Sequence, residues 1–239
     1  MDFASINAKY WAGIAADDII GDNAAPGDEL LSRLPVDAKL LDVGCGRGRM
    51  AGALSAKGYA VTAIDLNEEA IRNGRSRNDG VTYQVADVTD GLPFPDGTFD
   101  AVLTSFVLVN IPKTQRAGVV RELHRVLKPG GYAWINEGTA SEGYRLRYDL
   151  ARPYADEDRT FFVMGDKAFA SAIATPEDLK SAIGSGGVAR MAHHFTADEL
   201  RELFSDDDCL HAAASVTASP RTKTEIRMIT LVFRKPGTS

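Results

Sequence analysis

The chain has 239 residues, of which 44% are hydrophobic and 25% are charged, as in a soluble globular protein. Its net charge is −6, whereas a protein that binds a nucleic-acid backbone usually carries an excess of basic residues. We therefore expect no nucleic-acid partner. No secretory signal and no bilayer-length apolar run is visible, so we expect a cytoplasmic protein without membrane contacts. Cys45 and Cys209 lie far apart in no metal-binding spacing, so we expect no structural metal.

Strand-like and helix-like segments alternate through residues 40–136. Helices are expected from Met50 to a stop near Gly58, from Glu68 after an Asn67 cap, and over residues 114–127. The expected strands are 40–44, 60–65, 81–87, 99–106 and 132–136. This alternation predicts a parallel sheet covered by helices on both faces.

The rhythm breaks over residues 138–195, which we interpret as a small helical cap inserted after the fifth strand. A capping box of Thr196 and Glu199 then begins a helix. Strands over 214–219 and 226–234 are joined without a helix, so the last strand should run antiparallel. The prediction is an α/β, Rossmann-like, seven-stranded fold in a single domain, residues 1–239. Its parts are an N-terminal helical lid (1–35), a cofactor-binding core (36–137), the cap over the acceptor site (138–195), and a last helix with a β-hairpin (196–239).

The stretch "LLDVGCGRGRM", residues 40–50, combines a buried strand with a glycine-rich turn. Its glycines follow the pattern GxGxG, and Arg49 stands where the dinucleotide fingerprint has its third glycine. Asp42 places a negative charge beside a turn that would otherwise welcome a phosphate. These features disfavour a nicotinamide oxidoreductase and favour a ligand with a cationic group.

Acidic residues also end the next two predicted strands. Asp65 is placed to accept the two hydroxyls of a ribose. Asp87 is placed to pair with an adenine edge, while Leu66 and Val88 offer apolar faces to the ring. An adenosine with a positive centre and no phosphate fits these acids, and this description matches S-adenosylmethionine.

Four segments of the chain together resemble the successive motifs of class I S-adenosylmethionine-dependent methyltransferases. They are "LLDVGCGRGRM", "VTAIDLNEEAI", "VADVTDGLPFPDGTFDAVLTSFVLVNI" and "ELHRVLKPGGYAWI". The resemblance implies S-adenosylmethionine as cofactor and S-adenosylhomocysteine as product. It implies contacts to the methionine part from Asp42, Gly44, Cys45 and Gly46, to the ribose from Asp65, and to the adenine from Asp87 and Val88. It also implies that Ser105 and Phe106 lie beneath the sulfonium and that Tyr10 or Trp11 forms a lid.

The acceptor site is expected between the ends of the fourth and fifth strands and the cap. The candidate bases are His193, His194 and Glu137, although each also has an ordinary structural or solvated role open to it. Asn110 could orient an acceptor or cap a helix. Tyr144, Arg147 and Tyr148 form either an acceptor-binding face or a salt-bridged, solvated one.

These patterns predict methyl transfer to an O or N atom of a small molecule. The alternatives are a protein or tRNA methyltransferase and a non-catalytic S-adenosylmethionine-binding protein. The acidic composition disfavours tRNA. The sequence does not predict an oligomeric state.

Overall fold

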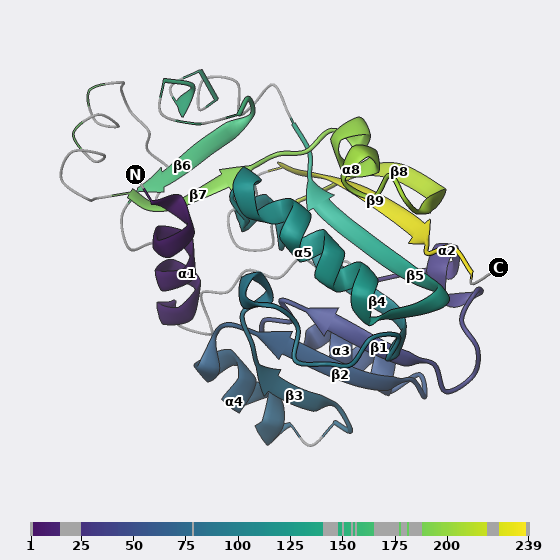
Figure 1. The fold of residues 1–239 in the computed structure, drawn as a ribbon. Helices are drawn as coiled ribbons and strands as arrows, with labels where there is room; N and C mark the ends of the chain where they lie inside the picture. Colours follow the sequence, from purple (N-terminus) through teal and green to yellow (C-terminus); the bar gives the residue numbers. More distant parts are fainter. Residues whose placement is uncertain are drawn as a thin grey trace.

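The computed structural model of the chain describes residues 2–14, 25–77, 79–140, 148–149, 151–153, 155, 157–164, 177, 181, 188–218 and 225–237. A seven-stranded sheet in the order β3-β2-β1-β4-β5-β9-β8 forms the centre of the fold (Figure 1). Its strands are β1 (Lys39–Val43), β2 (Ala60–Asp65), β3 (Thr82–Val85), β4 (Phe99–Ser105), β5 (Leu127–Gly138), β8 (Asp208–Ala218) and β9 (Glu225–Arg234).

The first five strands are parallel, and β9 runs antiparallel to both β5 and β8. Because only a short connection joins β8 to β9, the chain has no room for the crossover that a parallel neighbour would need. The expected Rossmann-like sheet with an antiparallel last strand is therefore confirmed.

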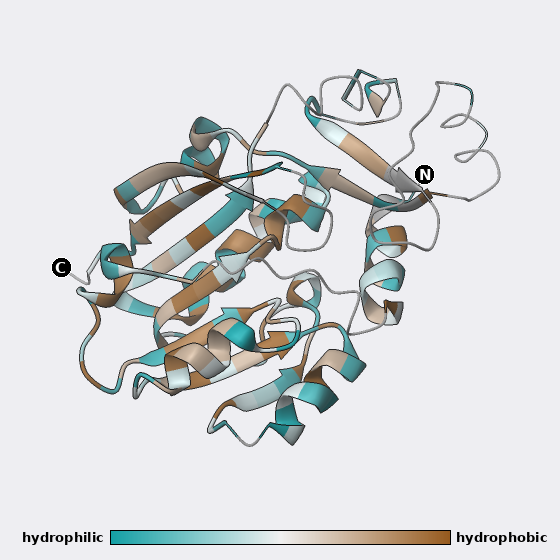
Figure 2. Ribbon diagram, turned by 180° about the vertical axis from the view of Figure 1, so that it is seen from behind, coloured by the Kyte–Doolittle hydropathy of each residue, from teal (hydrophilic) through white to brown (hydrophobic). Residues whose placement is uncertain are grey.

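Helices cover both faces of the sheet, and each face has its own apolar cluster. Helices α2 (Asp28–Leu31), α3 (Arg49–Ser55) and α4 (Glu68–Ser76) bury Leu30, Leu54 and Ile71 against one face. Helices α5 (Lys113–Val126) and α8 (Ala197–Leu203) bury Leu123 and Leu200 against the other. Figure 2 shows apolar residues following the strands between these layers. Among the described residues, no helix is long and apolar enough to cross a membrane.

Two predicted helix caps are present in the structure. The Asn67 side chain accepts a hydrogen bond of 2.8 Å from the Ala70 N–H at the start of α4. Thr196 and Glu199 form both halves of the capping box that begins α8. Such caps satisfy N–H groups that the first turn of a helix leaves without a partner.

The described part of the insertion contains two strands that the sequence did not predict. It contains β6 (Thr160–Met164) and β7 (Val188–His193), which pair as a separate antiparallel sheet. Phe162 and Met191, one from each strand, are buried, and aromatic side chains favour the pleated surface of a strand. Helix α1 (Phe3–Gly13) packs against β7 (Figure 1).

Candidate active site

The parallel strands end at one edge of the sheet, and this edge gathers most of the predicted site residues. Helix α1 is tied to the same edge through Asn67. The Asn67 amide donates hydrogen bonds to the carbonyl oxygens of Trp11, at 2.9 Å, and Ile14, at 2.8 Å. The first helix therefore lies beside the turn after β2, where a lid over a ligand at this edge would have to sit.

Asp42 is a buried acid near the end of β1. Its side chain is 1% exposed, and its Oδ2 has no hydrogen-bond partner within the described part of the chain. Burial, reinforced by the nearby charge of Asp65, raises the pKa of Asp42 to about 7. A buried carboxylate oxygen without a partner is costly, and a cationic ligand group would supply both the charge and the donor that it lacks.

Asp65 holds the glycine turn to the start of α4. Its Oδ2 accepts a 2.7 Å hydrogen bond from the Gly46 N–H, and its Oδ1 accepts one of 2.8 Å from the Asn67 N–H. Burial nevertheless raises its pKa. Each carboxylate oxygen can accept more than one hydrogen bond, so Asp65 keeps acceptor capacity for a pair of ligand hydroxyls.

The turn after β1 needs glycine for conformation and for space. Gly44, with φ of 69°, and Gly48, with φ of 71°, are in the left-handed region. Cys45 is half-buried between them, and burial raises the pKa of its thiol, as expected for a small packing residue.

Gly48→Ala should destabilise the fold. The new Cβ would overlap the Tyr83 hydroxyl, which is fixed by donating a 2.9 Å hydrogen bond to Asp79. With the added cost of a left-handed alanine, we expect a loss of roughly 2 kcal/mol, measured by urea unfolding. Gly13→Ala is the matched control, because its Cβ would meet nothing within 4 Å. Equal stability of the two variants would contradict this account of the turn.

The other cofactor candidates also lie at this edge. Asp87 begins a short 3-10 helix, η2 (Val88–Asp90), and its Oδ1 accepts hydrogen bonds from the Thr89 N–H and hydroxyl. Ser105 accepts a 3.0 Å hydrogen bond from the Asn136 amide, and Phe106 has a φ of 55°. Strained non-glycine residues of this kind cluster at functional sites. Val88 is buried and Leu66 is half-buried.

Tyr10 and Trp11, the predicted lid aromatics, pack edge to face with ring centres 5.1 Å apart. The Arg190 guanidinium of β7 lies 5.7 Å from the Tyr10 ring centre and 5.2 Å from that of Trp11. Asn7 fixes the helix to β7 by exchanging hydrogen bonds of 3.0 and 2.8 Å with the Met191 backbone. The position suits a lid; closure over a cofactor stays a prediction.

Glu137 does not face the crevice as the sequence suggested. It is fully buried, and its carboxylate accepts hydrogen bonds from the N–H groups of Val107, Leu108 and Val109. Burial raises its pKa to about 8 against the lowering effect of these bonds. These contacts make Glu137 the anchor of the 3-10 helix η3 (Leu108–Asn110) after β4.

The two neighbouring histidines occupy different environments. His193 is fully buried, with Nδ1 3.4 Å from Glu157 and Nε2 3.8 Å from Glu199. The Nδ1 of His194 lies 2.6 Å from the Tyr148 hydroxyl. The His194 ring also packs over Gly138.

A Cβ added to Gly138 would lie 2.9 Å from the His194 ring and 3.3 Å from the Phe106 ring. His194 therefore sits at the ends of β4 and β5. Asn110, buried in η3, accepts a 2.9 Å hydrogen bond from Arg190 and donates one of 2.8 Å to the Phe106 carbonyl. Tyr144 and Arg147 lie outside the described residues.

Comparison with known proteins identifies the core. Residues 41–135 match the family model described as "Methyltransferase domain". A solved S-adenosylmethionine-dependent methyltransferase from Methanosarcina mazei superposes with a TM-score of 0.72 and 28% identity, over 87% of this chain and 96% of that one. Residues 41–135 therefore form a class I S-adenosylmethionine-dependent methyltransferase domain.

Named relatives match this methyltransferase domain over part of their length. A demethylmenaquinone methyltransferase of Clavibacter sepedonicus is 44% identical over 102 residues, covering 41% of this chain and 40% of the relative. A 27-O-demethylrifamycin SV methyltransferase of Amycolatopsis mediterranei is 36% identical over 113 residues, covering 44% and 40%. The chain thus spans about two fifths of the length of these two relatives.

The residues at the sheet edge fit S-adenosylmethionine, the cofactor of the solved relative from Methanosarcina mazei. The unpartnered Asp42 oxygen matches the ammonium group of the methionine part. Asp65 offers acceptors for ribose hydroxyls at the end of β2. These assignments remain predictions for the individual residues, but the buried acid before the turn is the feature that a phosphate-bearing dinucleotide would not favour.

Sequence reasoning missed the residues that join α1 and the insertion to the core. Asn7 contacts Met191 across 184 positions of sequence, and Arg190 reaches Asn110 across 80. No local motif marks such contacts. The one available signal was the position of Arg190 three residues before His193, within a segment already assigned to the acceptor site.

Proposed function

We propose that this chain transfers a methyl group from S-adenosylmethionine to an O or N atom of a small-molecule acceptor. The observation that carries the proposal is the His194–Tyr148 pair, placed beside Phe106 at the ends of β4 and β5. The names of both relatives above also refer to small-molecule acceptors. The insertion, which contributes Tyr148, β6 and β7, would form most of the acceptor wall.

The cofactor supplies an already activated methyl group when it is bound, so the chain's own task is to bind, align and exclude water. Asp42 would hold the ammonium group and Asp65 the ribose hydroxyls. Val88 and Leu66 would flank the adenine. Phe106 and Ser105 would line the floor where the methyl group is transferred.

His194 is the proposed proton acceptor for a hydroxyl acceptor, or for an ammonium group that must lose its proton before its nitrogen can attack. If Nδ1–H donates to the Tyr148 oxygen across their 2.6 Å contact, Nε2 keeps its lone pair. The acceptor's proton would move to Nε2 as the acceptor atom bonds to the methyl carbon, while the bond from that carbon to the cofactor's sulfur breaks and S-adenosylhomocysteine leaves. Tyr148 orients the ring, and the half-buried position limits competition from water.

The test is methyl transfer from radiolabelled S-adenosylmethionine to a panel of metabolites, run with wild type and His194→Ala. We expect label in a small molecule and a turnover about 100-fold or more lower in the variant, since general-base catalysis commonly contributes that much. The cofactor-dependent rise in melting temperature should be unchanged, because His194 is not assigned to cofactor binding.

Three outcomes would overturn parts of this proposal. Label that enters only protein or tRNA fractions would replace the acceptor class. Stabilisation by S-adenosylmethionine with no transfer to any fraction would favour the non-catalytic binding protein. Unchanged turnover in His194→Ala would remove this histidine from the proton transfer.

A further inference from the structure

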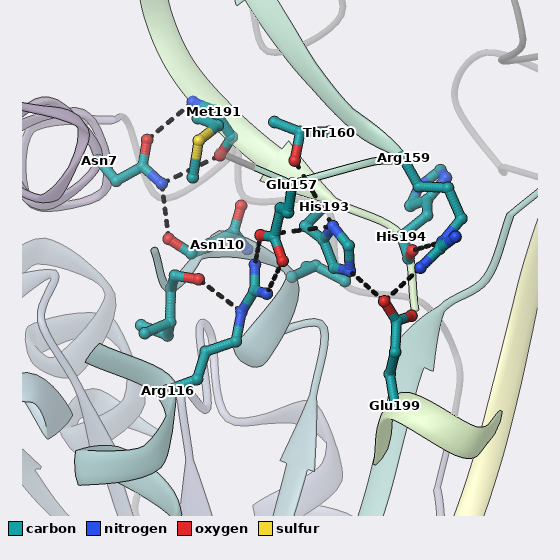
Figure 3. A network of polar contacts seen from close by, with 12 residues as sticks. Asn7, Asn110, Arg116, Glu157, Arg159, Thr160, Met191, His193, His194 and Glu199 are labelled. Atoms are coloured by element: carbon teal, nitrogen blue, oxygen red, sulfur yellow. Dashed lines mark hydrogen bonds and ion pairs between the residues drawn. The ribbon is translucent and has the colours of Figure 1, made fainter. Parts of the chain in front are cut away.

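A row of ionisable side chains lies beside His194 and joins α5, the insertion and α8 (Figure 3). Arg116 of α5 forms an ion pair with Glu157 of the insertion through two contacts of 2.6 Å. Glu157 lies 3.4 Å from His193 of β7, which lies 3.8 Å from Glu199 of α8. Glu199 in turn pairs with Arg159, also of the insertion. We refer to these five residues as the charge row.

The inner members of the charge row are shielded from solvent. Side-chain exposure is 4% for Arg116, 9% for Glu157 and 0% for His193. The Arg116 guanidinium also stacks over the Phe195 ring at 4.8 Å. One of these contacts is a hydrogen bond and the other a close ion-pair contact, so the guanidinium meets both carboxylate oxygens. Such an ion pair restricts both distance and orientation, and Glu157 thereby holds the insertion against core helix α5.

The charge row also fixes the backbone on both sides of the His194 ring. The Arg159 carbonyl accepts a 3.1 Å hydrogen bond from the His194 N–H, and Arg159 Nε donates one of 3.2 Å to the His194 carbonyl. The next residue, Phe195, donates a 2.9 Å hydrogen bond to the Gly138 carbonyl. His194 is thus held between the insertion and the end of β5.

Glu199 also takes part in the capping box of α8, which links the charge row to that helix. It accepts hydrogen bonds from the N–H and hydroxyl of Thr196 in the capping box. Although burial alone would raise it, hydrogen bonding by His193 and the Thr196 N–H lowers the pKa of Glu199 to about 2. Its negative charge therefore persists across the ordinary pH range, next to Arg159 and His193.

We propose that Glu157 and His193 are positioning residues, which hold the insertion on α5 so that the His194–Tyr148 pair stays over Gly138 beside Phe106. The proposal rests on the proposed function, in which His194 accepts the proton. It assigns His193 a role through its neighbour rather than contact with the acceptor. Buried ion pairs contribute little net stability compared with apolar packing. The role that we assign to the Arg116–Glu157 pair is therefore to hold the insertion in one arrangement.

The test uses Glu157→Gln, which keeps the shape of the side chain and removes its charge. Asp198→Asn is the matched control, because Asp198 pairs with Arg201 on α8 at 93% exposure. The readouts are amide hydrogen exchange at His194 and Phe195, and the ring ¹⁵N signals of His194, both in the full chain without acceptor. We expect exchange at these amides to be about tenfold faster in Glu157→Gln. The ring ¹⁵N signals should shift towards those of a mixture of tautomers, and Asp198→Asn should match wild type.

Arg116→Lys keeps the positive charge but loses the two-contact geometry, so it should shift the same signals by a smaller amount. It also serves if Glu157→Gln does not fold. The proposal is overturned if the folded variants have a lower melting temperature while the exchange rates and the ring signals of His194 stay at wild-type values. That result would make the charge row merely stabilising. Absence of methyl transfer alongside the expected signals would contradict the proposed function and leave the positioning role intact.

Discussion

Replacing Asp42 with asparagine should weaken the binding of S-adenosylmethionine by roughly 10- to 100-fold. The ligand's ammonium group would lose its charged partner, and hydrogen bonds to charged groups are worth about 1.5–3 kcal/mol. The side chain keeps its size, and its Oδ2 has no partner among the described residues to lose. Removing a buried negative charge should therefore leave the free energy of unfolding the same or higher. Isothermal titration calorimetry and urea unfolding measure the two quantities.

The same residue should make cofactor binding depend on pH. With a pKa of about 7 in the free protein, Asp42 is mostly protonated below that pH and ionised above it. Because an ammonium group binds the ionised form, binding below pH 7 must release a proton. The affinity should then fall by up to about tenfold per pH unit below 7 and level off above it.

Asp42→Asn is also the control for this pH dependence, because its affinity should be flat where that of wild type falls. Equal slopes in the two proteins would place the titrating group elsewhere. An Asp42→Asn variant with wild-type affinity at pH 8 would mean that the acid does not contact the ligand.

The placement of the cofactor candidates at one edge of the sheet could be predicted from the sequence because its signals are local. Two consecutive strand–turn–helix units, β1 to α3 and β2 to α4, contain these signals. The first holds Asp42 and the glycines, and the second holds Asp65 and the Asn67 cap. The sheet followed from the alternation of buried strands and amphipathic helices. In these regions the spacing along the chain determines the spacing in the fold.

The acceptor side could not be predicted in the same way, since its contacts are long-range. Glu137 looked like a crevice acid because the partners of its carboxylate come from a turn about 30 residues earlier. The strands of the insertion escaped notice because β6 and β7 are short and their pairing partner is distant in sequence. His193 and His194 are adjacent, and only the tertiary structure separates the buried ring from the one over Gly138.

Glu137→Ala should be among the most destabilising single substitutions in the core. It would leave the N–H groups of Val107, Leu108 and Val109 without their acceptor. Each unsatisfied buried group costs about 1–3 kcal/mol, so we expect a loss of roughly 3–5 kcal/mol in the free energy of unfolding. Glu137→Gln, which keeps one acceptor oxygen, should lose less. Urea unfolding at a fixed pH provides the comparison.

The pH dependence of stability tests whether the buried acid is the cause. Its pKa is raised from 4.5 to about 8 in the folded protein, so folding takes up a proton between these values. The stability that Glu137 contributes is fully present below pH 4.5 and is lost as the pH rises through 8. Between pH 5.5 and 8.5 the free energy of unfolding of wild type should fall relative to that of Glu137→Gln. If the difference in free energy of unfolding between wild type and Glu137→Gln stays constant over this range, Glu137 does not titrate there. The hydrogen bonds to the turn after β4 would then be its only contribution to stability.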